Sequence, residues 1–413
     1  MVLSAFETYM SLLASHRIYN NFIVGAQFKP LIKPNKIANV VSRLCRKHPQ
    51  FSLTVGRGHH QEYLPPYDVK NCIDVIDNSN PNKILEKYTA LKFSYSDKVP
   101  LWKLVLDSKS NTLFFVADHT YFDGTAVKKV YHEICKSFDE PEDDKLENSI
   151  IKPNFESYPT SAEMMKFEDK IVEIEPNIKG SSPEMDNELL KLPYYKHNYE
   201  VVHLSKEKSK HLIKLSRDNG FRITGLIYAI ANKAIVNSYD HNEEFEKLRT
   251  IIAVNTRFKI SPEVDQMLNE MGLFFGIYTH YDDISYVKNA EIFEMAKNFQ
   301  NGLNDNKHKC NDYWEHLETK SKIDRSIIDK AIHEIKLRDS KPLNTLFISN
   351  INVIGDDKIG KVYFDQPMFD SAFSLHLASS NDGMSLNFTC HRAIPRKIYD
   401  TYVSNVLGYI NDL

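Results

Sequence analysis

A histidine and an aspartate four residues apart have the types and spacing for acid–base chemistry in this chain. His119 follows an apolar run at 113–117, and Asp123-Gly124 then precedes an amphipathic segment. An imidazole with a pKa of about 6.5 can remove a proton from a hydroxyl or amino group at neutral pH. The spacing therefore predicts that His119 is a general base on a strand-to-helix turn.

Asp123 and Gly124 are predicted to shape that turn. A carboxylate can hold the turn by pairing with a cation, and a glycine permits a backbone geometry that a Cβ atom would forbid. The alternative is a buried histidine that only hydrogen-bonds at the end of a strand, which is the commoner role of a single histidine. The position between a buried strand and an amphipathic helix favours the catalytic interpretation.

Patterns for other chemistries are missing from the sequence. Residues 56–60 (Gly-Arg-Gly-His-His) lack the spacing of a phosphate-binding loop and a third metal ligand, so a surface turn is the preferred interpretation. No H-E-x-x-H or G-x-S-x-G motif occurs, and the five cysteines are far apart. We therefore expect no metal and no covalent acyl-enzyme, and the cysteine usage favours a reducing compartment.

The elements that must position His119 belong to a chain that mixes helical and strand periodicities. Helices are predicted near 3–13, 35–47, 206–218, 224–238, 290–303, 323–337 and 395–410. Strands are predicted near 19–28, 101–107, 112–118, 199–204, 250–254, 273–280, 343–349, 372–378 and 384–391. Strands and helices mixed in two similar halves predict an α/β (α+β) fold of two sandwich domains.

The boundary between these halves is predicted from a change in composition. Residues 139–144 form an acidic run, and several prolines follow in a polar stretch. We expect an N-terminal domain at 1–150, a crossover linker at 151–198 and a C-terminal domain at 199–413.

The composition limits the partners and the location. A net charge of -3 gives no footprint for nucleic acid, and no uncharged stretch reaches the roughly 20 residues that span a bilayer. The beginning of the chain has no basic leader or cleavage site, so we expect a cytoplasmic protein. We also expect a monomer. The apolar stripes near 3–13 and 399–410 could contact the surface of the endoplasmic reticulum or of lipid droplets, but they lack a basic face, which favours core packing.

The segment His119-Thr-Tyr-Phe-Asp123-Gly124 resembles the H-x-x-x-D-G motif of acyltransferases related to chloramphenicol acetyltransferase. That superfamily includes condensation domains of peptide synthesis, plant BAHD acyltransferases and fungal alcohol acetyltransferases. Shorter segments are similar to the fungal branch: Glu7-Thr-Tyr9, Arg17-Ile-Tyr19-Asn-Asn-Phe22, Leu44-Cys-Arg-Lys-His48-Pro49, Val254-Asn-Thr-Arg257 and Phe347-Ile-Ser349-Asn350. The chain lacks the Asp-Phe-Gly-Trp-Gly of the plant branch and the glycine that often follows such a Ser-Asn pair.

The resemblance implies a tunnel between two related domains, with His119 at its middle. Acyl-CoA would enter one end and the acceptor the other, and the acceptor would attack the thioester directly. Asp123 would be structural and paired with an arginine, for which Arg257 is the first candidate and Arg17 the second. Either Ser349 or Asn350 would donate a hydrogen bond to the developing oxyanion.

The sequence does not decide whether the acceptor is an alcohol or an amine. We expect acetyl transfer from acetyl-CoA to an alcohol, which gives an acetate ester. The alternative is transfer to an amine such as a sphingoid base or an amine drug, because His119 would serve either acceptor. A second alternative is a non-catalytic binding module that has kept the fold.

Overall fold

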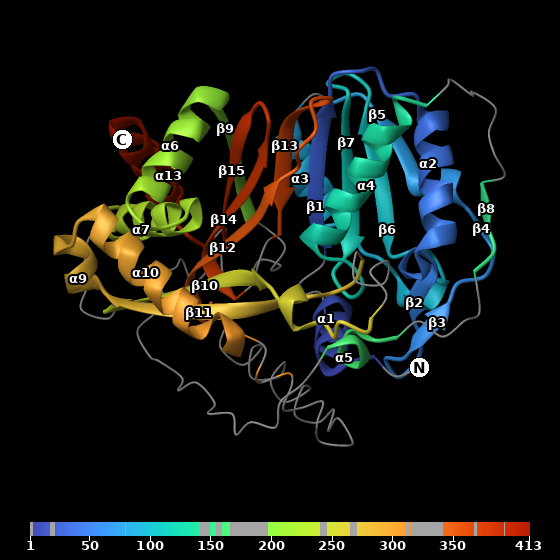
Figure 1. Cartoon of the computed structure of the whole chain (residues 1–413), viewed down its shortest axis with the longest axis horizontal. Helices are drawn as coiled ribbons and strands as arrows, with labels where there is room; N and C mark the ends of the chain where they lie inside the picture. Colours follow the sequence, from blue (N-terminus) through green and yellow to red (C-terminus); the bar gives the residue numbers. More distant parts are fainter. Residues whose placement is uncertain are drawn as a thin grey trace.

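Two β-sheets with helices packed on them make up the part of the chain that the structure describes (Figure 1). The structure is a computed structural model. It describes residues 3–16, 21–78, 80–140, 149–153, 159–165, 197–239, 246–264, 271–310, 312, 314, 342–366, 370–391 and 393–413. The helix predicted at 323–337 lies outside these residues.

The N-terminal sheet carries His119 at the end of a central strand. Its strands, in spatial order, are β13 (Ile359–Asp365), β1 (Asn21–Phe28), β7 (Thr112–Asp118), β6 (Trp102–Asp107) and β5 (Ile73–Ile76). Successive residues of a strand face opposite sides of a sheet. Phe115 of β7 therefore packs with α2 (Pro34–Lys47) and α4 (Gly124–Ser137), and Phe114 packs with α3 (Pro81–Thr89) on the other face.

The C-terminal sheet lies beside the first one. Its strands, in spatial order, are β11 (Phe275–Asp283), β10 (Lys247–Asn255), β12 (Asn344–Val353), β14 (Ser371–Ser380), β15 (Gly383–His391) and β9 (His197–Ser205). The helices of this half are α6 (Lys206–Asp218), α7 (Ile223–Val236), α9 (Ile284–Asn289), α10 (Ile292–Asn306) and α13 (Arg396–Asp412). Helix α7 is buried along most of its length, with α6, α9, α10 and α13 in contact with it.

Shorter elements complete the described chain. They are α1 (Ala5–Ser15), η1 (Pro49–Ser52), β2 (Leu53–Val55), β3 (Gln61–Tyr63), β4 (Tyr67–Asp68), η2 (Val69–Cys72), η3 (Tyr95–Asp97), β8 (Ile150–Ile151), α5 (Ser161–Met164), η5 (Arg257–Lys259) and η6 (Lys307–Lys309). Strands β2 and β3 pair with each other, as do β4 and β8.

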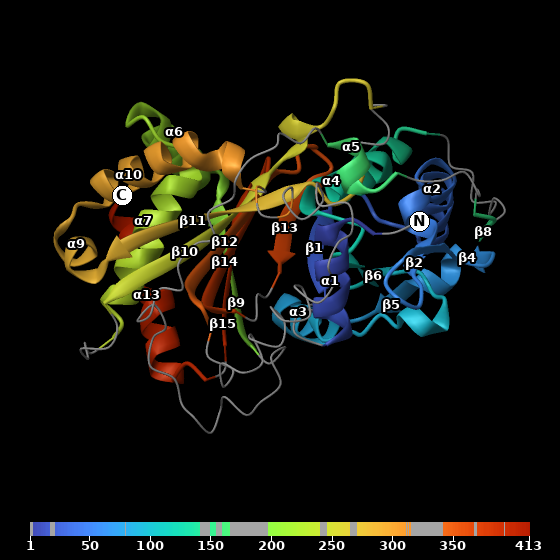
Figure 2. The ribbon, with the colours of Figure 1, turned by 90° about the horizontal axis from the view of Figure 1, so that it is seen from below.

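Strand β13 crosses from one half of the chain to the sheet of the other. It pairs antiparallel with β1 and also contacts β14 and β15, and both views place it between the two sheets (Figure 1, Figure 2). Its last residue, Asp365, accepts hydrogen bonds from Thr89 at 3.2 Å and from Asn387 at 2.8 Å, one on each side. The sequence analysis did not predict this strand. The predicted α/β fold is confirmed, and the predicted domain limits at 150 and 199 stay a prediction.

The apolar stripes of the two terminal helices are packed in the interior. The buried residues of these stripes are Leu3, Phe6, Met10 and Leu13 at the N-terminus and Tyr399, Tyr402, Val406 and Ile410 at the C-terminus. Among the helices that the structure describes, none has both the length and the hydropathy required to cross a membrane.

Candidate active site

Strand β7 and helix α4 fix both ends of the turn that carries His119. All seven residues of β7 are buried, and the apolar stripe of α4 packs against the same core. The hydroxyl of Tyr131 on α4 lies 2.6 Å from the carbonyl oxygen of Val24 and 2.9 Å from that of Leu113. These bonds tie the helix to β1 and β7, so the turn between them has little freedom to move.

One hydrogen bond determines which nitrogen of His119 can act as a base. Its Nδ1 lies 2.7 Å from the carbonyl oxygen of Phe122. A carbonyl oxygen only accepts hydrogen bonds, so Nδ1 carries the proton and Nε2 of the neutral ring holds the lone pair. The ring also packs against the rings of Phe22, at 4.7 Å, and Phe275, at 4.8 Å between centroids, which hold its orientation.

Burial keeps His119 in this neutral form. The side chain is 3% exposed, and burial lowers the pKa of His119 to about 4, although the nearby charge of Asp123 opposes the shift. A group with that pKa is unprotonated at neutral pH. The imidazole is therefore ready to accept a proton.

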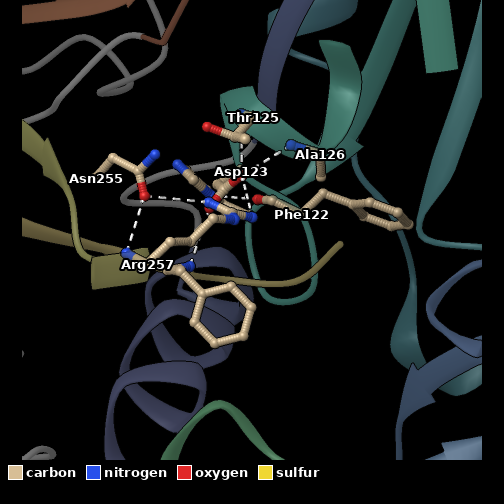
Figure 3. A network of polar contacts seen from close by, with 8 residues as sticks. Phe122, Asp123, Thr125, Ala126, Asn255 and Arg257 are labelled. Atoms are coloured by element: carbon tan, nitrogen blue, oxygen red, sulfur yellow. Dashed lines mark hydrogen bonds and ion pairs between the residues drawn. The ribbon is translucent and has the colours of Figure 1, made fainter. Parts of the chain in front are cut away.

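The carboxylate of Asp123 is occupied by structural contacts (Figure 3). Its Oδ2 accepts hydrogen bonds from Arg257 Nη1 at 2.7 Å and from the backbone N–H of Phe274 at 3.0 Å. Its Oδ1 accepts from Arg257 Nη2 at 3.1 Å and from the N–H groups of Thr125 and Ala126 in the first turn of α4. Asp123 is thus the N-cap of α4 and the partner of a bidentate arginine.

The charge on Asp123 is maintained by these partners. Burial by itself would raise the pKa of Asp123, but Arg257 and the backbone N–H groups hold it below its usual value. Arg257 lies over the ring of Phe274, at 4.9 Å, and is bound by Asn255 as well. Of the two arginines considered from the sequence, the structure pairs Arg257 with Asp123, and Arg17 lies outside the described residues.

Gly124 is required for a different reason from the one predicted. The sequence analysis attributed it to backbone geometry, but Gly124 is not among the glycines with a positive φ. A Cβ atom at this position would lie 2.4 Å from Cγ2 of Ile351 on β12. The glycine is therefore explained by the close approach of β12 to the start of α4.

A cavity of about 200 Å³ lies between the two halves and is lined by His119, Ser349 and Asn350. A second cavity, of about 170 Å³, shares Phe275 and Gln366 with it as lining residues. The two cavities occupy the place where the tunnel was predicted. His119 is thus accessible from a cavity despite its burial.

Several lining residues of the first cavity had no signal in the sequence. Arg222 and Thr224 at the start of α7, Gln300 of α10, and Phe275 and Gln366 all come from the second half of the chain. They meet at the site only through the folding of distant segments. Apart from Gln300, which lies in the middle of α10, they share a position at the ends of helices and strands, and this feature could have indicated them.

The turn at 56–60 shows no sign of a ligand site. It connects β2 to β3 with positive φ angles at Gly58 and His59, and His60 Nε2 lies 2.8 Å from Glu62. Within the described ranges, no group of three or more His, Cys, Asp or Glu side chains is arranged to hold a metal ion.

Comparison with known sequences gives a partial match at this site. Residues 69–178, which include the His119 turn, match the family model described as alcohol acetyltransferase. The N-acetyltransferase SLI1 of Saccharomyces cerevisiae is 21% identical over 167 residues. That match covers 38% of this chain and 35% of the yeast protein, so it spans about a third of the relative's length.

Solved structures match over nearly the whole chain. The trichothecene 15-O-acetyltransferase TRI3 of Fusarium sporotrichioides has a TM-score of 0.71 at 11% identity, over 99% of this chain and 94% of that one. The first condensation domain of the calcium-dependent antibiotic synthetase has a TM-score of 0.63 at 8% identity, over 99% and 95% of the two chains. At these identities the likeness shows the fold alone.

The fold of this chain is similar to those of the acetyltransferase TRI3 and of the condensation domain of the antibiotic synthetase. Residues 69–178, which include the His119 turn, are similar to the alcohol acetyltransferase family. The family resemblance predicted from the histidine motif is confirmed.

Proposed function

We propose that this protein transfers an acetyl group from acetyl-CoA to an alcohol and so forms an acetate ester, with His119 as the general base. The observation that carries the proposal is the bond from His119 Nδ1–H to Phe122, which puts the lone pair on Nε2 in a ring that lines the cavity between the two halves. The match of residues 69–178 to alcohol acetyltransferases supports the reaction class.

The reaction needs one proton transfer in each direction. Nε2 of His119 removes the proton of the acceptor hydroxyl while its oxygen attacks the thioester carbonyl, and the carbonyl electrons move to the carbonyl oxygen. Collapse of this intermediate breaks the C–S bond, and the proton on His119 passes to the CoA sulfur. The products are the ester and free CoA, and the imidazole returns to its neutral form.

Ser349 is the preferred donor to the oxyanion. The side-chain amide of Asn350 donates to Thr224 Oγ1 at 3.1 Å, and its carbonyl accepts from the N–H of Asn352. Ser349 lines the same cavity, and within the described chain its hydroxyl takes part in no hydrogen bond. Its O–H is therefore available to a developing negative charge, an interaction that typically contributes a few kcal/mol.

Transfer to an amine is the second candidate, because the matching segment of the yeast relative belongs to a protein named as an N-acetyltransferase. An amine presents its nitrogen to Nε2 of His119 as an alcohol presents its oxygen, so the base serves both acceptors. A binding module without activity is the third candidate.

Identification of products separates these candidates. The purified protein is incubated with acetyl-CoA and a panel of primary alcohols and amines, and the products are identified by mass spectrometry. Ester formation is the expected result. Amide formation alone would assign the enzyme to N-acetylation, and the absence of any product with intact acetyl-CoA would indicate a binding module.

We place the reaction in the cytoplasm, in a monomer. The five cysteines are all free, and four of them are buried, as expected for a reducing compartment. Burial of both terminal stripes argues against a membrane contact through these helices with the endoplasmic reticulum or lipid droplets. Cell fractionation tests the location, and recovery of the protein with the membrane pellet would overturn it.

A further inference from the structure

The second cavity has walls suited to an apolar ligand. We call it the α1 compartment, and its apolar lining residues include Phe6, Met10 and Leu13 of α1, Ile251 of β10, Ile277 of β11 and Trp314. Its two charged lining residues, Arg249 and Asp370, have opposite signs. The compartment therefore offers apolar contact area without a net charge that would favour a charged ligand.

Helix α1 is held firmly as one wall of this compartment. The side chains of Ser4 and Glu7 each accept a hydrogen bond from the backbone N–H of the other, which caps the first turn. Glu7 also accepts a hydrogen bond, 3.2 Å long, from the N–H of Ser161 on α5. In Figure 1 the helix lies beside the ends of β10 and β11, and the ring of Phe6 contacts that of Phe275. One wall of the compartment is thus a capped helix.

Aromatic rings connect the compartment to the base. Phe275 lies 4.8 Å from the ring of His119 and 5.0 Å from that of Phe6, and Phe6 in turn lies 5.2 Å from Trp314. Phe275 thus contacts both the imidazole of His119 and the ring of Phe6, which lines the compartment. A molecule with its reactive group at His119 would place its remaining atoms along these rings.

Gln366 is a polar residue shared by the two cavities. It is 4% exposed, it follows the anchored Asp365, and none of the hydrogen bonds among the described residues involves its side chain. Neither amide atom of Gln366 is among the sealed polar atoms without a partner in the described part of the chain, so the amide is accessible from the cavities. At this junction it can donate or accept a hydrogen bond with a polar group of a bound molecule.

We infer that the acetyl acceptor has an apolar tail that lies in the α1 compartment, and that Gln366 binds its hydroxyl or amino group beside His119. The inference rests on the proposed function and narrows the acceptor from any alcohol or amine to one with an extended apolar body. The tail would contact the ring of Phe275, so this residue would determine which acceptors fit.

A homologous series of acceptors tests this inference. We measure kcat/KM for CoA release from acetyl-CoA with unbranched primary alcohols and amines of increasing chain length. Each methylene that enters the compartment should raise kcat/KM about fourfold, the value of one buried CH₂ group, until the compartment is full. Values independent of chain length would overturn the inference.

Two variants of α1 should shift this dependence in opposite directions. Met10→Trp fills the compartment and should remove the gain in kcat/KM for long chains. Phe6→Ala enlarges it and should move the optimum to longer chains. Ser15→Trp, at an exposed position of the same helix, is the matched control and should behave as wild type.

Gln366→Leu tests the polar half of the inference. The variant should lose at least tenfold in kcat/KM for the acceptor, with the KM for acetyl-CoA and the melting temperature unchanged, because no hydrogen bond of the described chain is broken. An unchanged kcat/KM, or a loss explained by a lower melting temperature, would contradict the role of Gln366.

The outcomes separate this inference from the proposed function. Activity that depends on His119 but not on chain length, Met10 or Gln366 would refute the inference and leave the proposed function standing. A wild-type protein without activity on any acceptor would refute both.

Discussion

At the scale of single residues, the site is defined by which hydrogen bonds are already taken. Nδ1–H of His119 donates a hydrogen bond to the carbonyl of Phe122. Both oxygens of Asp123 accept hydrogen bonds from Arg257 and from backbone N–H groups. The aspartate is therefore not placed to orient the imidazole, unlike the aspartate of a serine-protease triad. In this site the backbone performs that role.

The lowered pKa of His119 predicts the pH profile. Because burial lowers it to about 4, the base stays unprotonated well below pH 6.5, and kcat/KM for the acceptor should fall only as pH drops through about 5 to 4. The measurement is a profile from pH 4 to 8. An acidic limb centred at 6.5 or above would contradict the assignment.

The same shift makes the folded state sensitive to acid, which sets the control for that profile. The unfolded chain binds a proton at this histidine near pH 6.5 and the folded chain does not, so this contribution to the free energy of unfolding decreases as pH falls below about 6.5. Circular dichroism at each pH distinguishes a loss of rate from a loss of structure.

Asp123→Asn should act on stability. It removes the counter-charge of Arg257, and we expect a loss of about 3 kcal/mol in the free energy of unfolding, as for other broken buried ion pairs. Asp400→Asn, which breaks the exposed pair with Arg396, is the control and should cost less than about 1 kcal/mol. Urea denaturation measures both, and normal stability of Asp123→Asn with abolished turnover would mean that the carboxylate takes part in the chemistry.

At the scale of elements, the site depends on the approach of β12 to the start of α4. Ile351 on β12 lies so close to Gly124 that no larger residue fits. Ser349 and Asn350, two and one residues earlier on the same strand, line the cavity with His119. The glycine therefore sets the distance between the base and the proposed oxyanion donor.

Gly124→Ala should disturb this contact. The added Cβ would overlap Cγ2 of Ile351, so we expect a lower melting temperature and at least a tenfold loss of kcat. The second change Ile351→Leu removes the branch at Cβ and should partly restore both. Gly408→Ala on α13 is the control, because nothing lies within 4 Å of the new Cβ, and it should stabilise by about 0.5–1 kcal/mol. A Gly124→Ala protein with wild-type activity would contradict the account.

What the sequence could predict follows from which signals are local. The segment from β7 to α4 has a strand run, a turn and a helical stripe in 26 consecutive residues, and both its elements and His119 were predicted (113–138). Strand β13 was missed because Gly360 and Lys361 interrupt the apolar pattern at the beginning of Ile359–Asp365. Phe275 and Gln366 carry no local signal, since their role arises only when β11 and β13 meet at the site.

At the scale of the whole molecule, β13 joins the two halves into one structure. It completes the N-terminal sheet with residues from the C-terminal half, and the buried Asp365 at its end accepts hydrogen bonds from Thr89 on one side and Thr389 on the other. The cavities lie at this junction. Separation of the halves would therefore disrupt the N-terminal sheet as well as the site.

This arrangement predicts cooperative unfolding. Differential scanning calorimetry should give a single transition, because β13 belongs to the C-terminal half of the chain and completes the N-terminal sheet. Under the proposed function acetyl-CoA binds the native state between the halves, so it should shift the transition upward as a whole. Two separate transitions, of which only one shifts, would show that the halves unfold independently.

Replacement of His119 is the most direct test of the central claim, which is that its Nε2 takes the proton of the acceptor. CoA release from acetyl-CoA with the best acceptor is compared between wild type, His119→Ala, and His132→Ala on the exposed face of α4. We predict a loss of about a thousandfold in kcat for His119→Ala and wild-type activity for His132→Ala. Full activity of a folded His119→Ala protein would contradict the account.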